Sequence, residues 1–209
     1  MFKFGRKGRK THWEDVYRKH RPNELGWYQE SPDVSLRIIE STGVGEDGKI
    51  IDVGGGASPL IELLVAKGIN VTVLDISSNA LEEAKKRLGN VSDKVKWIVA
   101  DITKYKFTQT YDIWHDRAVF HFLTNPLDRK EYVACLNSAL RVGGYLVMST
   151  FGPAGPRKCA GLRTMRYSPE SLHKEIGDNF YLAESGDEIH LTPTAKEQEF
   201  IYCVFKKCQ

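Results

Sequence analysis

The chain has 209 residues, 41% of them hydrophobic, and its four cysteines show no metal-ligand spacing such as CxxC. This length suits one domain with an ample core, and no apolar run approaches the roughly 18–20 residues of a membrane span. The start of the chain lacks the apolar segment of a signal peptide, so we expect a cytoplasmic protein that holds no metal.

The net charge of +3 is distributed unevenly. Five cations fall within the first ten residues, namely Lys3, Arg6, Lys7, Arg9 and Lys10, which leaves a net charge near −2 (3 − 5) on the remainder. A basic arm can bind nucleic acid or an acidic protein, but no aromatic-rich binding surface accompanies this one. We therefore interpret residues 1–10 as a flexible, solvated arm and expect no nucleic-acid partner.

From residue 11 onward, patterns typical of helices and strands alternate. Capping residues, prolines and closing glycines predict helices over 11–20, 31–41, 59–67, 77–88 and 126–141, the last closed by Gly143-Gly144, and another from 168 onward. Strands are expected over 49–53, 70–74, 95–100, 111–115, 145–150, 180–184 and 198–206. This alternation predicts a single domain built on a parallel sheet.

The turn after the first predicted strand is the most informative segment. The strand carries Asp52 near its end, and Gly54, Gly55 and Gly56 follow before a helix. Such a turn leaves backbone N–H groups bare at a helix N-terminus, where carboxylate, hydroxyl or phosphate groups bind. By itself the turn suits either a dinucleotide or S-adenosylmethionine (SAM).

Acidic residues at the ends of the next strands favour SAM. Asp75 comes 21 residues after the first of these glycines, where an acid accepts both hydroxyls of an adenosine ribose. Asp101 and Ile102 suit the amino group and ring edge of adenine. Asp52 suits an ammonium group such as that of SAM but would repel a pyrophosphate, and Pro59 replaces the third glycine of the dinucleotide fingerprint.

With these motifs in order, the chain resembles the class I SAM-dependent methyltransferases from about Trp13 to Phe205. The matching segments are IIDVGGGAS, VTVLDIS, VADI and YDIWHDRAVFHFL. The resemblance implies an α/β fold with one Rossmann-like, doubly wound sheet of seven strands. This sheet would be mostly parallel with an antiparallel C-terminal hairpin, in the order 3-2-1-4-5-7-6. SAM would be the cofactor, S-adenosylhomocysteine (SAH) its product, and no metal would take part.

The resemblance also implies a set of cofactor-binding residues in the glycine turn, at the strand ends and before the first strand. These are Trp13, Tyr17, Trp27, Asp52, Gly54, Gly55, Gly56, Asp75, Ile76, Asp101, Ile102 and His115. Aromatic residues are dense before the first strand, so we expect a helical lid over residues 11–45 and a core over 46–209. An aromatic wall can hold a sulfonium cation. The alternative is a helix packed permanently on the sheet edge.

Asp116, Arg117 and His121 are the candidate catalytic residues. Asp116 ends the fourth strand, where many methyltransferases place a group that contacts the methionine part or the acceptor. Arg117 would hold an anionic substrate or pair with an acid. His121 would deprotonate an acceptor near neutral pH, or pack as an ordinary buried histidine between two phenylalanines.

The Trp13-x-x-x-Tyr17 pair, the segment Gly26-Trp27-Tyr28-Gln29 and the triplet Asp116-Arg117-Ala118 are similar to the thiopurine and thiol methyltransferase branch. That branch has a longer N-terminal region and usually a tryptophan at the position of His115. The similarity implies in-line methyl transfer to a small soft nucleophile such as a thiol.

Two alternatives remain for the function. Small seven-strand protein-lysine methyltransferases share the acidic-basic-small triplet, which would make a docked protein the acceptor. A SAM-binding scaffold without catalysis is the other alternative. A closed aromatic chamber would favour a small-molecule acceptor, and an open acidic groove a lysine. We expect a small-molecule acceptor and no membrane partner.

Overall fold

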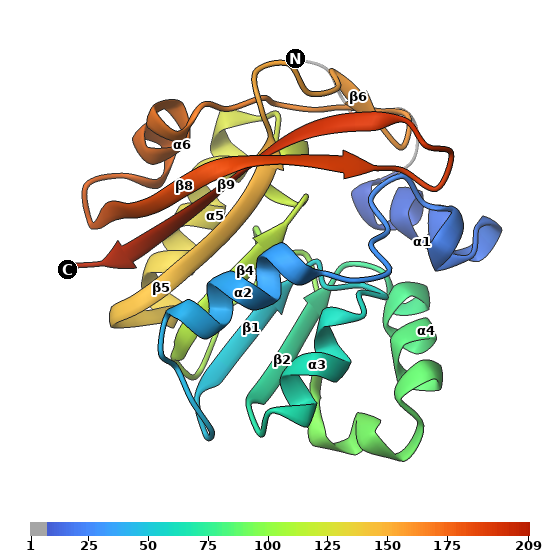
Figure 1. Cartoon of the computed structure of the whole chain (residues 1–209), viewed down its shortest axis with the longest axis horizontal. Helices are drawn as coiled ribbons and strands as arrows, with labels where there is room; N and C mark the ends of the chain where they lie inside the picture. The colour runs from blue at the N-terminus through green and yellow to red at the C-terminus, as the bar shows by residue number, and fades with distance from the viewer. Residues whose placement is uncertain (1–7) are drawn as a thin grey trace.

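A seven-stranded sheet runs through the middle of the protein (Figure 1). The computed structural model describes residues 8–209. The strands of this sheet are β1 (Lys49–Val53), β2 (Asn70–Asp75), β3 (Lys96–Val99), β4 (Tyr111–Arg117), β5 (Leu140–Phe151), β8 (Phe180–Leu191) and β9 (Glu197–Lys207). They lie in the order β3-β2-β1-β4-β5-β9-β8, which confirms the predicted order 3-2-1-4-5-7-6 when the strands of this sheet are counted along the chain.

The first five strands of the sheet are parallel, and the last two are antiparallel to their neighbours. Parallel neighbours need a long crossover, whereas a connection as short as residues 192–196, between β8 and β9, suits an antiparallel pair. Every residue of β1 after Lys49 is buried. Such a continuous buried run is typical of a strand that helices cover on both faces.

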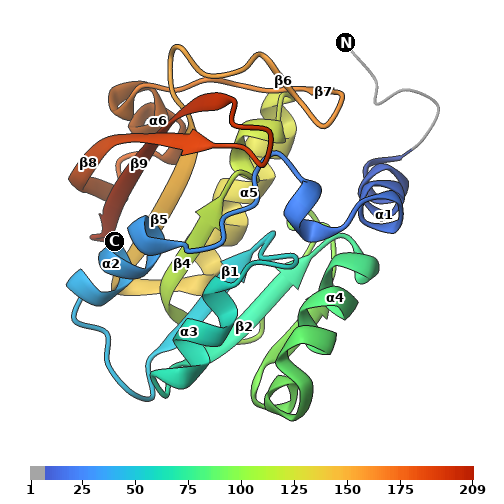
Figure 2. The ribbon, with the colours of Figure 1, turned by 45° about the vertical axis from the view of Figure 1, so that its right-hand side comes forward.

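Helices cover both faces of the sheet (Figures 1 and 2). α2 (Asp33–Ser41), α3 (Leu60–Ala66) and α4 (Ser78–Leu88) bury their apolar residues on one face, and α5 (Pro126–Ala139) and α6 (Pro169–Ile176) on the other. α1 (Arg9–Lys19) lies beside α4. Three 3₁₀ helices span Pro22–Glu24, Gly89–Lys94 and Phe120–Phe122, and a hairpin of β6 (Lys158–Cys159) and β7 (Leu162–Arg163) forms a separate small sheet.

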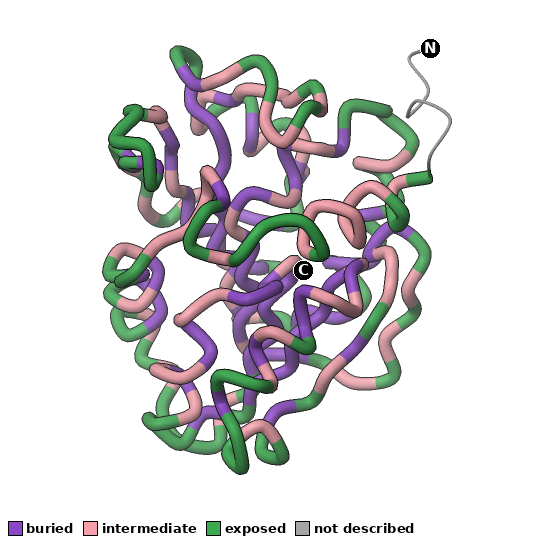
Figure 3. The backbone as a smooth tube through the Cα atoms, turned by 90° about the vertical axis from the view of Figure 1, so that its right-hand side faces the viewer, coloured by how far each residue is buried: buried purple, intermediate pink, exposed green. Residues whose placement is uncertain are grey.

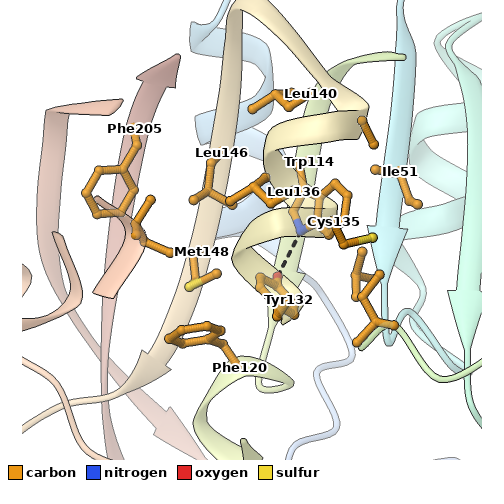
Figure 4. Packing of buried hydrophobic residues seen from close by; sticks show 14 of the residues in the cluster. Ile51, Trp114, Phe120, Tyr132, Cys135, Leu136, Leu140, Leu146, Met148 and Phe205 are labelled. Atoms are coloured by element: carbon orange, nitrogen blue, oxygen red, sulfur yellow. Dashed lines mark hydrogen bonds between the residues drawn. The ribbon is translucent and has the colours of Figure 1, made fainter. Parts of the chain in front are cut away.

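The largest core side chains lie between the sheet and α5 (Figure 4). Trp114 of β4 and Tyr132 of α5 are fully buried, and the Trp114 indole donates a hydrogen bond of 2.8 Å to the Tyr132 hydroxyl. Phe120 packs on Tyr132 with 5.0 Å between ring centroids. These aromatic side chains supply large apolar area, and the hydrogen bond satisfies both buried polar groups. Buried residues are concentrated at the centre of the molecule (Figure 3).

The boundary between the fifth predicted helix and the strand after it differs from the expectation. α5 ends at Ala139 and β5 begins at Leu140, so Gly143 and Gly144 lie inside a strand and do not close a helix. Gly143 has a φ of +78°, and a Cβ on Gly144 would lie 2.8 Å from the carbonyl oxygen of Asp112. The glycine pair lies where the pairing of β4 with β5 changes register, which side chains would obstruct.

The first helix begins earlier than the sequence predicts. α1 includes Arg9 and Lys10, so the flexible arm over residues 1–10 is wrong at its C-terminal end. The reason is that Arg9 forms ion pairs with two aspartates of the core. Lys3, Arg6 and Lys7 lie outside the described residues. Within residues 8–209, no helix is long and apolar enough to cross a membrane.

Candidate active site

The turn after β1 has no room for side chains. Gly54 has a φ of +67° and Gly56 a φ of +47°, which glycine adopts without strain. A Cβ on Gly54 would lie 2.0 Å from a methyl group of Val119, and one on Gly56 would lie 2.8 Å from the Tyr17 hydroxyl. The turn is therefore a backbone cradle at the C-terminal end of β1 that side chains would fill.

Two cavities adjoin this turn. The first is lined by α1, the turn and the ends of several strands, including Arg9, Trp13, Asp75, Ile76, Asp101, Ile102 and Phe122. The second is lined by the chain before α3 and by β4, including Leu25, Tyr28, Ser35, Asp52, Gly55 and His115. Tyr17, Trp27, Gly54 and Arg117 line both cavities and so mark their junction. Of the site residues expected from the sequence, Gly56, Asp116 and His121 line neither cavity.

Asp75 ends β2 and faces the first cavity. Its Oδ1 atom accepts a hydrogen bond of 2.8 Å from the Ser77 N–H, which fixes the carboxylate above the glycine turn. Burial raises the pKa of Asp75 to about 7, the nearby acids Asp52 and Glu14 contribute in the same direction, and backbone hydrogen bonds oppose the shift. The carboxylate is thus available as an acceptor, although its charge is only partly stabilised.

Asp101 follows β3 and is already paired. Its Oδ1 accepts hydrogen bonds of 3.0 Å from both the Thr103 N–H and the Arg9 guanidinium, and Oδ2 lies 3.1 Å from the same Arg9 nitrogen. The other end of the Arg9 guanidinium pairs with Asp128 on α5. The acid expected to receive an adenine amino group is therefore held by Arg9 of α1.

Glu14 attaches α1 to the N-terminus of α4. Its carboxylate accepts hydrogen bonds from the Ser77 hydroxyl at 2.9 Å, the Ser78 N–H at 2.9 Å and the Asn79 N–H at 3.1 Å. The first N–H groups of a helix lack partners within the helix, and its dipole favours a negative charge there. Burial opposes ionisation of Glu14, but these hydrogen bonds outweigh it, so its pKa is lowered.

Aromatic rings form the wall between α1 and the strands. Trp13 packs edge-on against Trp27 and Phe122, with ring centroids 5.6 and 4.9 Å apart. Tyr17 meets Trp27 at 6.4 Å. Because Trp27 belongs to the loop after α1 and Phe122 to the chain after β4, the wall joins segments that are distant in sequence.

Arg117 anchors the Trp27 loop to the end of β4. One terminal nitrogen donates a hydrogen bond of 3.1 Å to the Trp27 carbonyl, and the other lies 3.3 Å from a carboxylate oxygen of Glu188 on β8. The guanidinium carbon lies 4.6 Å from the centroid of the Phe200 ring. Gln29 donates to the same Glu188 oxygen at 2.8 Å. Burial lowers the pKa of Arg117, and Glu188 acts in the opposite direction.

A hydrogen-bonded chain of three side chains borders the second cavity. His115 Nδ1 lies 2.7 Å from Asp52 Oδ1, and His115 Nε2 lies 2.9 Å from the Ser35 hydroxyl. The other oxygen of Asp52 is buried, without a hydrogen-bond partner among the described residues, and a Cβ on Gly55 would lie 2.5 Å from it. Asp52 therefore lies beneath the glycine turn, and its charge reaches the cavity mainly as an electrostatic field.

Asp116 differs from the expectation that it faces the cofactor or acceptor. Its side chain is fully buried and satisfied within the core, since Oδ2 accepts the Tyr132 hydroxyl at 2.6 Å. Oδ1 accepts the backbone N–H groups of Val119 at 2.9 Å and Phe120 at 3.4 Å. Burial raises the pKa of Asp116 to about 6 despite these hydrogen bonds. The contacts are those of a structural residue that holds the turn after β4 onto α5.

His121 also lies away from both cavities. Its ring stacks on Phe151, with centroids 4.2 Å apart, and its Nδ1 accepts a hydrogen bond of 3.3 Å from the Phe151 N–H. Burial, together with the charge of Arg117, lowers the pKa of His121 to about 3. A neutral, fully buried imidazole fits the packing alternative and is badly placed for a general base.

Sequence reasoning missed four residues of this site: Arg9, Glu14, Ser35 and Glu188. Each contacts residues more than 60 positions away in the chain, so no local pattern indicates the pairing. Across the described part of the chain, no group of three or more His, Cys, Asp or Glu side chains could hold a metal ion.

Residues 50–144 match the family model of the methyltransferase domain. A solved structure of a SAM-dependent methyltransferase from Anabaena variabilis shares the fold, with a TM-score of 0.75, 15% identity and 96% coverage of each chain. The N-methyltransferase NodS from Bradyrhizobium japonicum, in complex with SAH, also shares it. Its TM-score is 0.70 and its identity 15%, and the match covers 94% of this chain and 98% of that chain. Residues 50–144 therefore match a methyltransferase domain, the chain has the fold of these two structures, and together the findings support a SAM-dependent methyltransferase.

Curated relatives carry different acceptors in their names. The malonyl-[acyl-carrier protein] O-methyltransferase 2 of Ilyobacter polytropus is 29% identical over 149 residues, which cover 70% of this chain and 51% of the relative. The EEF1A lysine methyltransferase 2 of Danio rerio is 26% identical over 166 residues, 68% of each chain. The chain spans about half the length or less of the first malonyl-[acyl-carrier protein] methyltransferases that it matches. These names do not single out the thiopurine and thiol branch.

Proposed function

We propose that the protein transfers a methyl group from SAM to a small-molecule acceptor. The observation that carries this proposal is the aromatic wall of Trp13, Trp27 and Phe122, which lines the first cavity beside its junction with the second. A small acceptor can reach the junction beside such a wall, whereas a lysine of a folded protein needs an open groove. The resemblance to the thiopurine and thiol branch agrees with this acceptor class.

In this proposal the two cavities share one cofactor. The first would take the adenosine, with Asp75 at the ribose and Asp101 with Ile102 at the adenine, and the second would take the amino-acid end above Asp52. The sulfonium would then lie at the junction, among the residues that line both cavities. Arg9 would share the Asp101 carboxylate with adenine or yield to it.

When bound, SAM supplies a methyl group on a positively charged sulfur, and in-line attack of a nucleophile on this methyl group displaces the sulfur. The residues of this chain hold and orient the two partners, which can contribute about 7–11 kcal/mol to lowering a barrier. The rings of Tyr17 and Trp27 at the junction attract a cation by about 0.5–2 kcal/mol. The wall excludes water from the reacting atoms.

The surroundings of Asp116 and His121 support an acceptor that needs little help from a base. Neither side chain reaches a cavity, and the lowered pKa of His121, caused by burial, keeps its imidazole neutral. A thiol with a pKa of about 8.5 ionises in part at neutral pH without a committed base. We therefore propose a thiol or a comparably soft nucleophile as the acceptor.

A protein-lysine acceptor is the second candidate. It is favoured by the lysine methyltransferase relative, which matches over 68% of both chains. An outer groove between the loop after α1 and β8, lined by Glu30, Glu188 and Ile189, offers the acidic side chain of Glu30 to an approaching lysine.

The experiment offers SAM with a tritiated methyl group to cell extract with the purified protein. We expect the label in the small-molecule and volatile fractions, and less label with the Asp75→Ala variant at a SAM concentration that does not saturate it. Label in protein bands would replace the small-molecule proposal with the lysine candidate. Binding of SAM without any transfer would leave the scaffold alternative.

A further inference from the structure

Arg117 places a positive charge at the junction of the two cavities. Its side chain is only 10% exposed, and it lines both cavities together with Tyr17, Trp27 and Gly54. A buried guanidinium is costly unless an opposite charge accompanies it. The electrostatics of this point therefore depend on what pairs with Arg117.

The partner is Glu188, which comes from the edge strand of the sheet. Its carboxylate is also only 10% exposed and lies 3.3 Å from the Arg117 guanidinium. Gln29 donates a hydrogen bond of 2.8 Å to the same carboxylate oxygen. Phe200, which Glu188 faces in the pairing of β8 with β9, lies under the guanidinium. The pair is thus held between the loop after α1 and the C-terminal hairpin.

The cofactor brings a positive charge to the same place. In the proposed arrangement the sulfonium of SAM lies at the junction, and two like charges repel strongly where little water screens them. SAH has the same atoms without the methyl group, and its sulfur is neutral. An unpaired Arg117 would therefore weaken the binding of SAM relative to SAH and favour the product over the substrate.

We propose that Glu188 is a positioning residue that acts through Arg117: it neutralises the guanidinium, so that the junction accepts a sulfonium. This proposal rests on the proposed function, because it needs SAM to span both cavities. Asp52 and Asp75 also line the cavities and attract the sulfonium, but they remain unchanged when Glu188 is varied.

The ratio of the dissociation constants for SAM and SAH tests this role. Glu188→Gln removes the charge but keeps the size of the side chain and an oxygen for the Gln29 hydrogen bond. Isothermal titration calorimetry on the full chain should show the SAM-to-SAH ratio raised by about three- to tenfold, as expected for an added charge in a partly screened site. A purely structural residue would change both affinities by the same factor.

Three further variants test the direction in which the SAM-to-SAH ratio changes. Arg117→Met with Glu188 intact leaves a negative charge and should lower the SAM-to-SAH ratio. This variant tests the proposal even if Glu188→Gln does not fold. The double variant Arg117→Met/Glu188→Gln should restore a ratio near that of the unmodified protein. Gln29→Ala removes a neutral hydrogen-bond donor and is the matched control, with an unchanged ratio.

Equal changes in both affinities for Glu188→Gln, or a shift in the same direction for Arg117→Met, would overturn the proposal. Binding of SAM and SAH to the unmodified protein distinguishes a failure of the proposed function from a failure of the role of Glu188. If it binds neither SAM nor SAH, the proposed function itself fails. If it binds both while the variants keep its ratio, only the role of Glu188 is rejected.

Discussion

The carboxylates of Asp52, Asp75 and Asp116 occupy similar positions at strand ends but have different partners. The carboxylate of Asp116 accepts hydrogen bonds inside the core, and that of Asp52 is hydrogen-bonded to His115 beneath the glycine turn. Asp75 is the one of the three that faces the first cavity. Residue type and position in the strand are therefore insufficient, since the neighbouring side chains decide what each acid can do.

Binding of SAM should strengthen as the pH rises through about 7, the pKa to which burial raises Asp75. Below that pH the carboxyl group is protonated, and it must lose this proton before it can accept both ribose hydroxyls. Asp75→Ala should weaken binding at pH 8 by roughly 1.5–3 kcal/mol, the scale for hydrogen bonds to charged groups. Titration calorimetry at pH 6 and 8 measures both effects.

The control is Asp75→Asn, examined for stability without ligand. An unfolded aspartate titrates near pH 4, whereas burial raises the pKa of Asp75 to about 7 in the folded protein. Ionisation of Asp75 therefore destabilises the folded state, and the free energy of unfolding falls as the pH rises from about 4 to 7. The asparagine variant should therefore be more stable than the parent at pH 8 and similar to it at pH 4. Wild-type affinity for SAM in Asp75→Ala would refute the ribose assignment.

At the scale of elements, α1 is attached by polar contacts at its first turn and near its middle. None of its residues is fully buried, and it is held by Arg9 on Asp101 and Asp128 and by Glu14 on the N-terminus of α4. Helices attached in this way open at low free energy, because few buried apolar contacts oppose the opening. The contacts therefore fit a lid that is closed in this structure and can be released.

Glu14→Ala should loosen α1 while the sheet stays folded. Loss of a helix cap costs about 0.5–2 kcal/mol, so amide hydrogen exchange should accelerate over residues 9–19, with little change in the strands. Glu82→Ala is the matched control, because Glu82 is an exposed acid of α4 that pairs only with Lys85 among the contacts described for it. If saturating SAH leaves the exchange of α1 unchanged in the parent protein, α1 is permanently packed and the lid interpretation is wrong.

At the scale of the molecule, the site joins segments from the whole described chain: α1, the glycine turn, the ends of β2 to β4, and β8. The cavities open above the C-terminal ends of the parallel strands, where sheets of this kind bind their ligands. A ligand that bridges so many elements should stabilise the fold as a unit.

SAH at a concentration one hundred times its dissociation constant should raise the free energy of unfolding by about 2.7 kcal/mol. For a chain of this size, the shift in Tm should be roughly 5–10 °C. Differential scanning calorimetry with the parent protein and with Asp75→Ala at the same SAH concentration measures it, and the variant should show a smaller shift. A shift caused by NAD and not by SAH would contradict the assignment of the cofactor.

The glycine turn and the alternation of strands and helices were predictable from local patterns of the sequence. The order of strands and the class of cofactor followed from the family resemblance that these motifs carry. The direction of individual side chains at the end of β4 was not predicted. Successive residues of a strand face opposite sides, so Asp116 joins Trp114 on the α5 side, while His115 and Arg117 face the cavities.

The tertiary structure alone decided which polar side chains meet. Arg9 reaches Asp101 across 92 positions, Ser35 reaches His115 across 80, and Arg117 reaches Glu188 across 71. Surface-type residues of this kind have no periodicity that indicates a partner, and their pairing follows from how α1, α2 and β8 pack around the sheet. The sequence by itself therefore determined the framework and its ligand class, and packing determined the electrostatics of the site.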